Sequence, residues 1–256
     1  MKENKLIDGS DVPLEVGAKY TSPEIGAKYT SPKTGIFSTI RAIIYNCFAV
    51  LHTLIIYLRL GIELKTNKDL LPYGSRIMEV GPGTGMGTQH LVALFEERRI
   101  EYQGIDLDPS YTSQFRQTMW YNPERMQIII GDFLATKPDS YKKIDILIMI
   151  ECMMLIPELQ LWQHLKLCKQ SNPKLRIVMA HTEFEQGSWW TWIVSWIKPW
   201  LYWITTMSFG RTIIRQEFLE SAKDLGQHKF VDEHHEPGII VNYNIFGNPV
   251  RLYCIE

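Results

Sequence analysis

The stretch that decides the fold reads Ile77-Met78-Glu79-Val80-Gly81-Pro82-Gly83-Thr84-Gly85-Met86-Gly87. Its apolar start predicts a buried strand, which ends at an acidic residue and breaks into a glycine loop. A helix is predicted to follow, from about Met86 to Glu97. Glycines at every second position allow a sharp turn and a close approach of the backbone to a ligand, which a Cβ would obstruct. This order of elements predicts the first unit of a doubly wound α/β nucleotide site.

The spacing of the glycines narrows the class of nucleotide. A dinucleotide fingerprint needs a glycine at its sixth position. That position is Met86 when counted from Gly81 and Thr88 when counted from Gly83. A P-loop is also excluded, because no Gly-Lys-Ser/Thr follows the loop. The loop therefore matches neither of these two phosphate-binding fingerprints.

Three later segments place further motif residues near the ends of predicted strands. They are Tyr102–Asp106, Met126–Phe133 with Gly-Asp-Phe after the strand, and Asp145–Glu158 with Asp at its start and Pro-Glu at its end. A carboxylate after the second strand can accept both hydroxyl groups of a ribose. Asp108 competes for this role, but Asp106 is favoured because it directly follows Gly-Ile.

In this order and spacing, the four segments resemble the class I S-adenosylmethionine (SAM)-dependent methyltransferases of small molecules. The resemblance covers about residues 75–256. It implies that the glycine loop passes under the amino-acid end of SAM and that Asp106 binds the ribose. It also implies that Asp132 binds the adenine amino group while its neighbour packs on the ring. The implied cofactor residues are Tyr29, Glu79, Gly81, Gly83, Gly85, Asp106, Asp132, Phe133 and Glu151.

The chain departs from the family pattern after the fourth predicted strand. Many relatives carry His at the positions that Glu151 and Leu155 occupy here. The catalytic role that the family assigns to those positions is therefore not carried over directly.

Composition predicts a single cytoplasmic α/β unit with appendages. A chain of 256 residues is long enough for one such core and too short for two. Its 27 Lys and Arg against 28 Asp and Glu leave no basic footprint for nucleic acid. The four cysteines show no metal or disulfide spacing, and no secretory signal is visible at the polar start.

The N-terminal region divides into a tail and an apolar segment. Residues 1–34 lack apolar periodicity and contain a tandem repeat, which is interpreted either as a local duplication in a tolerant tail or as a segment that closes over the cofactor. In the second case Tyr29, in the copy nearer the fold, is the candidate contact and Tyr20 the spare. Residues 35–72 are predicted to form a helical cap over the acceptor site. Because Ala42–Leu58 contains no Asp, Glu, Lys or Arg, membrane association is the alternative.

An aromatic insertion follows the fifth predicted strand, Leu175–His181. Six of the eight tryptophans fall within residues 185–212, and a cap of two short helices bent at Pro199 is predicted. In the family the corresponding segment covers the acceptor, so Trp189, Trp190 and Trp192 are the candidate substrate contacts. They would line an apolar pocket or stack on a cationic amine. Ordinary core packing and a membrane-interface belt are the alternatives.

The C-terminal part completes the predicted fold. A helix is expected over Ile214–Leu225, then strands over Lys229–Glu236 and Val250–Ile255, with Ile239–Phe246 as an extension of their hairpin. The predicted architecture is a doubly wound, seven-stranded α/β sheet. The resemblance implies that its last two strands form an antiparallel hairpin, within a SAM-binding domain over residues 73–256.

Methyl transfer from a sulfonium is an in-line displacement, which the protein promotes mainly by proximity and alignment. A base is needed only when the acceptor starts protonated. His181, at the predicted carboxyl end of its strand, is the first candidate base and Glu151 the second, while Glu183 and His234 are weaker candidates. No metal is predicted.

The predicted function is transfer of a methyl group from SAM to O or N of a small, apolar or aromatic acceptor. One alternative is a lipid or prenyl-quinone methyltransferase docked on membranes. Another is a SAM-binding protein without methyl transfer. A nucleic-acid or protein methyltransferase is disfavoured by the balanced charge and by the absence of an Asn/Asp-Pro-Pro-aromatic motif.

Overall fold

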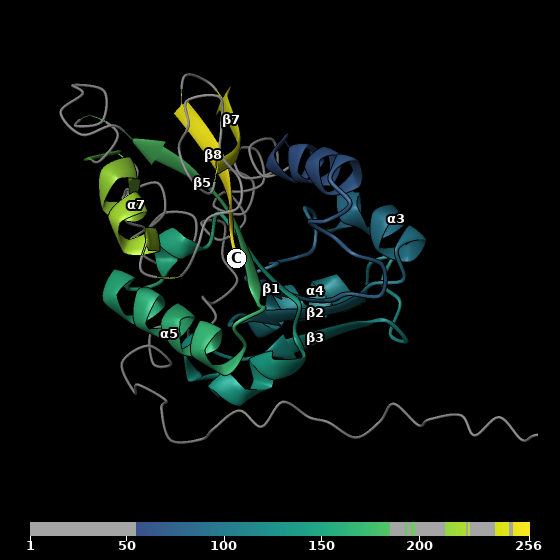
Figure 1. The fold of residues 1–256 in the computed structure, drawn as a ribbon. Helices are drawn as coiled ribbons and strands as arrows, with labels where there is room; N and C mark the ends of the chain where they lie inside the picture. The colour runs from purple at the N-terminus through teal and green to yellow at the C-terminus, as the bar shows by residue number, and fades with distance from the viewer. Residues whose placement is uncertain are drawn as a thin grey trace, which may run out of the picture.

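A computed structural model describes residues 55–184, 193, 196–197, 213–223, 225, 239–245 and 248–256. The chain within these ranges forms an α/β fold around one mostly parallel sheet (Figure 1). Its strands are β1 Arg76–Val80, β2 Glu101–Asp106, β3 Met126–Ile130, β4 Ile146–Ile150, β5 Arg176–Phe184, β6 Ile213–Ile214, β7 Ile239–Ile245 and β8 Asn248–Ile255. Its labelled α-helices are α3 Gln89–Glu97, α4 Pro109–Arg116, α5 Glu158–Ser171 and α7 Arg215–Lys223. Three 3₁₀ helices cover Phe133–Ala135, Pro138–Lys143 and Met153–Leu155, and an unlabelled helix covers 55–66.

The strand order is β3-β2-β1-β4-β5-β8-β7. Strands β1 to β5 are parallel, while β8 runs antiparallel to both β5 and β7. The chain passes from β1 outward to β3 and then returns to the other side of β1 as β4. Ligands of such sheets bind outside the carboxyl ends of the strands at this reversal. We therefore expect a ligand site at the edge of the sheet where β1 and β4 end.

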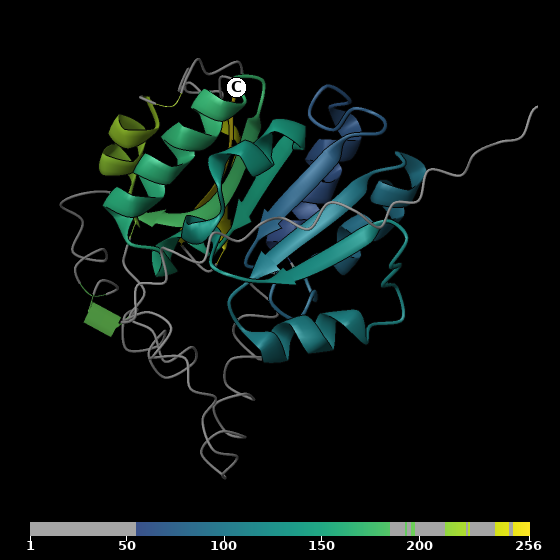
Figure 2. The same ribbon diagram turned by 90° about the horizontal axis from the view of Figure 1, so that it is seen from below.

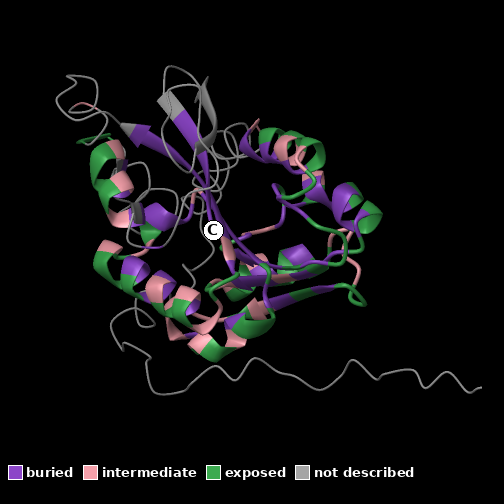
Figure 3. Ribbon diagram, in the orientation of Figure 1, coloured by how far each residue is buried: buried purple, intermediate pink, exposed green. Residues whose placement is uncertain are grey.

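Helices cover both faces of the sheet, as the view from below shows (Figure 2). One apolar cluster joins the helix over 55–66, α3 and α4 to the sheet, and a second joins α5 and α7 to the opposite face. Strand β4, Ile-Leu-Ile-Met-Ile, is buried along its whole length. A continuous apolar run of this kind is expected where helices cover a parallel strand on both faces. The strands are accordingly the most buried part of the described chain (Figure 3).

The α/β class and the mostly parallel sheet are confirmed, while several boundaries differ from prediction. Helix α3 begins at Gln89, three residues later than expected, because turns continue the loop. Strand β5 extends to Phe184 and not to His181. The strand beside β8 is Ile239–Ile245, whereas the predicted strand Lys229–Glu236 lies outside the described residues. The short β6 adds a strand beyond the seven predicted, so the described sheet has eight.

Part of the predicted N-terminal cap falls within the described chain. The helix over 55–66 buries Ile56, Tyr57, Leu60 and Leu64 against the α/β core. Across the described ranges, no helix combines the length and apolar character needed to cross a bilayer. The tail with Tyr29, the tryptophans Trp189, Trp190 and Trp192, and His234 all lie outside those ranges.

Candidate active site

The glycine loop after β1 adopts a backbone that side chains rarely adopt. Gly81, Gly83 and Gly85 have φ values of 67°, 59° and 81°. A Cβ on Gly81 would lie 3.0 Å from Cβ of Cys152, whereas a Cβ on Gly83 would meet nothing within 4 Å. Gly85 packs on Phe115 and the ring of Trp120. Two of the glycines thus permit close packing, and Gly83 presents bare backbone where a ligand has room to approach.

A carboxylate at the end of β2 holds this loop. Asp106 accepts a hydrogen bond from Gly83 N at 2.9 Å through Oδ2 and one from Asp108 N at 2.9 Å through Oδ1. Burial raises the pKa of Asp106, against the lowering effect of these two donors. Asp108 instead caps α4, because its Oδ1 accepts from Ser110 N at 2.7 Å. The structure therefore separates the two competing residues and joins Asp106 to the loop.

Glu79 lies beneath the loop and is 1% exposed. Its carboxylate accepts hydrogen bonds from Tyr102 at 2.6 Å, from Thr88 at 2.9 Å and from the hydroxyl of Tyr57. Burial raises the pKa of Glu79, and the three hydroxyl donors partly offset that effect. These contacts tie β2, the start of α3 and the helix over 55–66 to the end of β1. Direct binding of a cofactor by Glu79 stays a prediction.

Asp132 follows β3 at the same edge of the sheet. Its Oδ1 accepts a hydrogen bond from Leu134 N at 2.9 Å, which caps the 3₁₀ helix that begins at Phe133. The Phe133 ring is buried and meets the His164 ring edge-on, with centroids 4.6 Å apart. Burial lowers the pKa of His164 to about 4. The His164 ring therefore packs against the buried Phe133 ring. Contact of Phe133 with an adenine ring stays a prediction.

Glu151 follows β4 in the left-handed region, with φ of 50°. Its Oε1 accepts hydrogen bonds from the backbone N–H of Thr182 at 2.7 Å and from the hydroxyl of Thr182 at 2.8 Å. The next residue, Cys152, is the one that faces Gly81. Glu151 therefore lies one residue from the contact with the glycine loop, and its binding to a cofactor stays a prediction.

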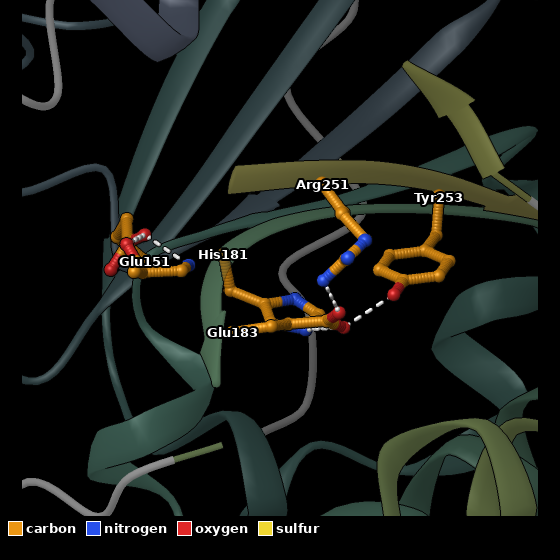
Figure 4. A network of polar contacts seen from close by, with 6 residues as sticks. Glu151, His181, Glu183, Arg251 and Tyr253 are labelled. Atoms are coloured by element: carbon orange, nitrogen blue, oxygen red, sulfur yellow. Dashed lines mark hydrogen bonds and ion pairs between the residues drawn. The ribbon is translucent and has the colours of Figure 1, made fainter. Parts of the chain in front are cut away.

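His181 belongs to a buried polar cluster between β5 and β8 (Figure 4). Its Nε2 lies 2.8 Å from Glu183 Oε1, which also accepts from the hydroxyl of Tyr253, and Arg251 donates to Glu183 Oε2 at 2.7 Å. The ring of Phe218 lies 4.4 Å from the imidazole between centroids. We call His181, Glu183, Arg251 and Tyr253 the β5–β8 cluster.

The β5–β8 cluster changes the interpretation of His181 as a base. The imidazole has 0% exposure, and β5 continues for three residues beyond it. A general base must come within hydrogen-bonding reach of the proton that it removes. In this geometry His181 is enclosed in the core and its Nε2 is already engaged with Glu183. Its proposed catalytic role is therefore less favoured than that of Glu151.

Several residues that contact the motif residues were not predicted from the sequence. They are Tyr57, Thr88, Tyr102, Thr182, Arg251 and Tyr253, together with Leu107. Leu107 directly follows Asp106 at the end of β2 and is 40% exposed, so an apolar residue after the motif acid was a usable signal. No local pattern marked the hydroxyl donors. Within the described ranges, no group of three His, Cys, Asp or Glu residues is arranged to hold a metal ion.

No protein-family model matches the sequence, and no curated protein matches it. Solved structures match its shape. An O-methyltransferase family protein from Burkholderia thailandensis gives a TM-score of 0.54 at 10% identity, over 86% of this chain and 58% of that chain. The mitomycin 7-O-methyltransferase MmcR gives 0.52 at 15%, over 78% and 53%. LepI, solved in complex with SAM, gives 0.51 at 14%, over 77% and 46%.

The likeness to these structures establishes the fold, which this chain shares with the O-methyltransferase family protein, with MmcR and with LepI. The chain spans about half the length of the structures that it matches. The resemblance of motifs and the resemblance of shape therefore agree on architecture.

Proposed function

We propose that this protein is a SAM-dependent methyltransferase that acts on O or N of a small, apolar or aromatic acceptor. The observation that carries the proposal is the hydrogen bond between Asp106 and Gly83, at the edge of the sheet where β1 and β2 end. It places a carboxylate and an open glycine backbone together, as the ribose and the amino-acid end of SAM would require.

The described residues fit the cofactor. Each oxygen of Asp106 accepts one backbone N–H, and a carboxylate oxygen has a second lone pair available for a ribose hydroxyl. A Cβ would fill the space beside Gly83, which glycine leaves open. Leu107 and Asp132 provide an exposed apolar side chain and a carboxylate at the ends of β2 and β3. These positions are suited to an adenine ring and its amino group.

The protein contributes alignment to the reaction. When bound, SAM supplies a methyl group that is already electrophilic, so orientation of the acceptor accounts for much of the rate gain. Glu79 stabilises the loop from below through its three hydroxyl donors. Glu151 is the candidate to orient or deprotonate an acceptor, because it is the carboxylate at the end of β4. The proposed acceptor contacts Trp189, Trp190 and Trp192 remain proposals from the sequence.

Isothermal titration with S-adenosylhomocysteine (SAH), with NAD as the control, tests the proposal. Micromolar binding of SAH and no binding of NAD are expected. A folded protein that binds NAD or binds neither compound would overturn the assignment. Transfer of labelled methyl groups to lipophilic phenols and amines then tests the acceptor class. Equal turnover on DNA or protein substrates would contradict the proposed small acceptor.

A further inference from the structure

Glu151 has a strained backbone that the surrounding structure maintains. A non-glycine residue with φ of 50° is uncommon, because the left-handed conformation brings the Cβ of an L-residue close to the following carbonyl oxygen. Its own N–H donates to Ala180 O at 2.9 Å, which extends the pairing of β4 with β5 by one residue. Strained residues of this kind gather at ligand sites, where the rest of the fold holds them in place.

Only one of the two oxygens of the Glu151 carboxylate accepts hydrogen bonds from the described residues. Both donors of Thr182 bind Oε1, and no donor from the described residues binds Oε2. The side chain is partly exposed, and no Lys, Arg or His within the described ranges forms a salt bridge with it. Oε2 thus keeps its acceptor capacity, while Thr182 fixes the orientation of the carboxylate through Oε1.

The β5–β8 cluster fixes the strand that carries Thr182. Residues alternate between the two faces of a strand, so Thr182 points away from its neighbours His181 and Glu183. His181 and Glu183 are fully buried, and Glu183 accepts hydrogen bonds from Arg251 and Tyr253 of β8. Figure 4 shows Arg251 and Tyr253 converging on Glu183, while Glu151 forms its own contacts on the other side of β5. Movement of Thr182 would therefore disturb a buried charged cluster.

We infer that Glu151 is a pre-oriented receptor for an ammonium group beside the glycine loop. This inference rests on the proposed function and deepens it. A fixed anion without a protein cation is suited to a primary or secondary ammonium, which donates charge-assisted hydrogen bonds. Two sources have this chemistry, namely the α-ammonium of the cofactor and the amine of an acceptor. The contact of Cys152 with Gly81 places the receptor next to the loop on which both would meet.

The experiment compares the full-length wild type with Glu151→Gln by titration against three nucleosides. SAH carries the α-ammonium. Sinefungin carries the α-ammonium and a second ammonium at the position of methyl transfer. 5′-Methylthioadenosine carries neither. Glu124→Gln is the matched control, because it removes the same charge from an exposed residue near the opposite end of the sheet.

A receptor for the cofactor's α-ammonium predicts that Glu151→Gln weakens SAH and sinefungin by about 10- to 100-fold and leaves methylthioadenosine unchanged. A receptor for an acceptor amine predicts a loss of that size for sinefungin alone. Equal affinities, or equal losses for all three nucleosides, overturn the inference while the proposed function stands. If the wild type does not bind SAH, the proposed function falls and the inference with it.

Thr182 provides a second test, which separates orientation from folding. Thr182→Val removes the hydroxyl donor and keeps the backbone donor, so it is expected to give a smaller loss for the same nucleosides as Glu151→Gln. Thr182→Ser restores the hydroxyl and is expected to restore affinity. If Thr182→Ser and Thr182→Val weaken binding equally, Thr182 does not orient Glu151 through its hydroxyl.

Discussion

Asp106 Oδ2 accepts a hydrogen bond from Gly83 N at 2.9 Å, across 23 residues of sequence. The bond joins the carboxyl end of β2 to the loop after β1. The other oxygen of Asp106, Oδ1, accepts a hydrogen bond from the backbone N–H of Asp108. The carboxylate is therefore fixed in place, and it fixes the loop through Gly83. Cofactor affinity and loop geometry should therefore depend on the same carboxylate.

Asp106→Asn should weaken SAH binding by about 10- to 100-fold, because the amide loses the charge and one acceptor that the loop and a ribose share. Asp108→Ala is the matched control. It removes the N-cap of α4 and should lower the free energy of unfolding by about 0.5–2 kcal/mol while SAH affinity stays near that of the wild type. Titration and urea unfolding of both variants measure the contrast. Equal affinities for the two variants would exclude the assignment of Asp106.

Gly87→Ala should destabilise the protein, because a Cβ at this position would lie 2.2 Å from the ring of Tyr57. Overpacking of this kind typically costs about 1–3 kcal/mol. The Tyr57→Ala variant relieves the clash, so the double variant should be more stable than the sum of the single effects predicts. Urea unfolding of the four proteins gives the coupling energy. Strict additivity would mean that the helix over 55–66 does not dock on the loop as described.

Arg251→Met should destabilise the protein by about 3–5 kcal/mol, because it leaves Glu183 buried without its cation. Arg251→Met combined with Glu183→Gln removes both charges and should recover part of the loss. Circular dichroism establishes that each variant folds, and urea unfolding measures the difference. A double variant less stable than Arg251→Met would show that the cluster is stabilised by something other than this ion pair.

Glu79 and Glu183 should make the free energy of unfolding depend on pH in opposite directions. Burial raises the pKa of Glu79, so the folded state holds a proton that the unfolded state has released, and stability falls as pH rises from 4.5 through the folded value. Burial also acts to raise the pKa of Glu183, but its bonds to His181 and Tyr253 and the charge of Arg251 lower it overall. The stability that Glu183 provides is therefore present above pH 4.5 and lost as pH falls through the folded value.

Urea unfolding of Glu79→Gln and Glu183→Gln at a series of pH values measures these two dependences. Relative to the wild type, Glu79→Gln should flatten the decline on the neutral side, and Glu183→Gln should flatten the decline on the acid side. Parallel profiles for the wild type and a variant would show that the substituted carboxyl group does not titrate differently in the folded state.

The sequence identified the strands and the loop because both leave local signals. Apolar runs such as that of β4 predict strands buried on both faces, and the alternate glycines predict a turn with unusual backbone angles. The same signals favoured Asp106 over Asp108 only by its place directly after Gly-Ile, and they could not show what either side chain contacts. A hydrogen bond to Gly83 and a helix cap at Ser110 decide between them, and each depends on how the chain is placed in space.

The end of β5 was predicted too early for a related reason. His-Thr-Glu reads as a polar end to an apolar strand, yet Glu183 is fully buried because Arg251 and Tyr253 supply its partners from 68 and 70 residues away. A buried charge is tolerated when it is paired and hydrogen-bonded. The pairing of β8 with β5 that brings those partners close has no signature within β5 itself.

The sequence by itself determined the α/β class, the glycine loop and the order of the motif acids, since periodicity and glycine spacing act over a few residues. Only the tertiary structure decided what each acid does. Asp106 holds the loop, Glu79 is enclosed by hydroxyl groups and Glu151 is oriented by Thr182. The physical reason is that the role of a carboxylate depends on its donors and its burial, and the fold brings those donors from distant parts of the chain.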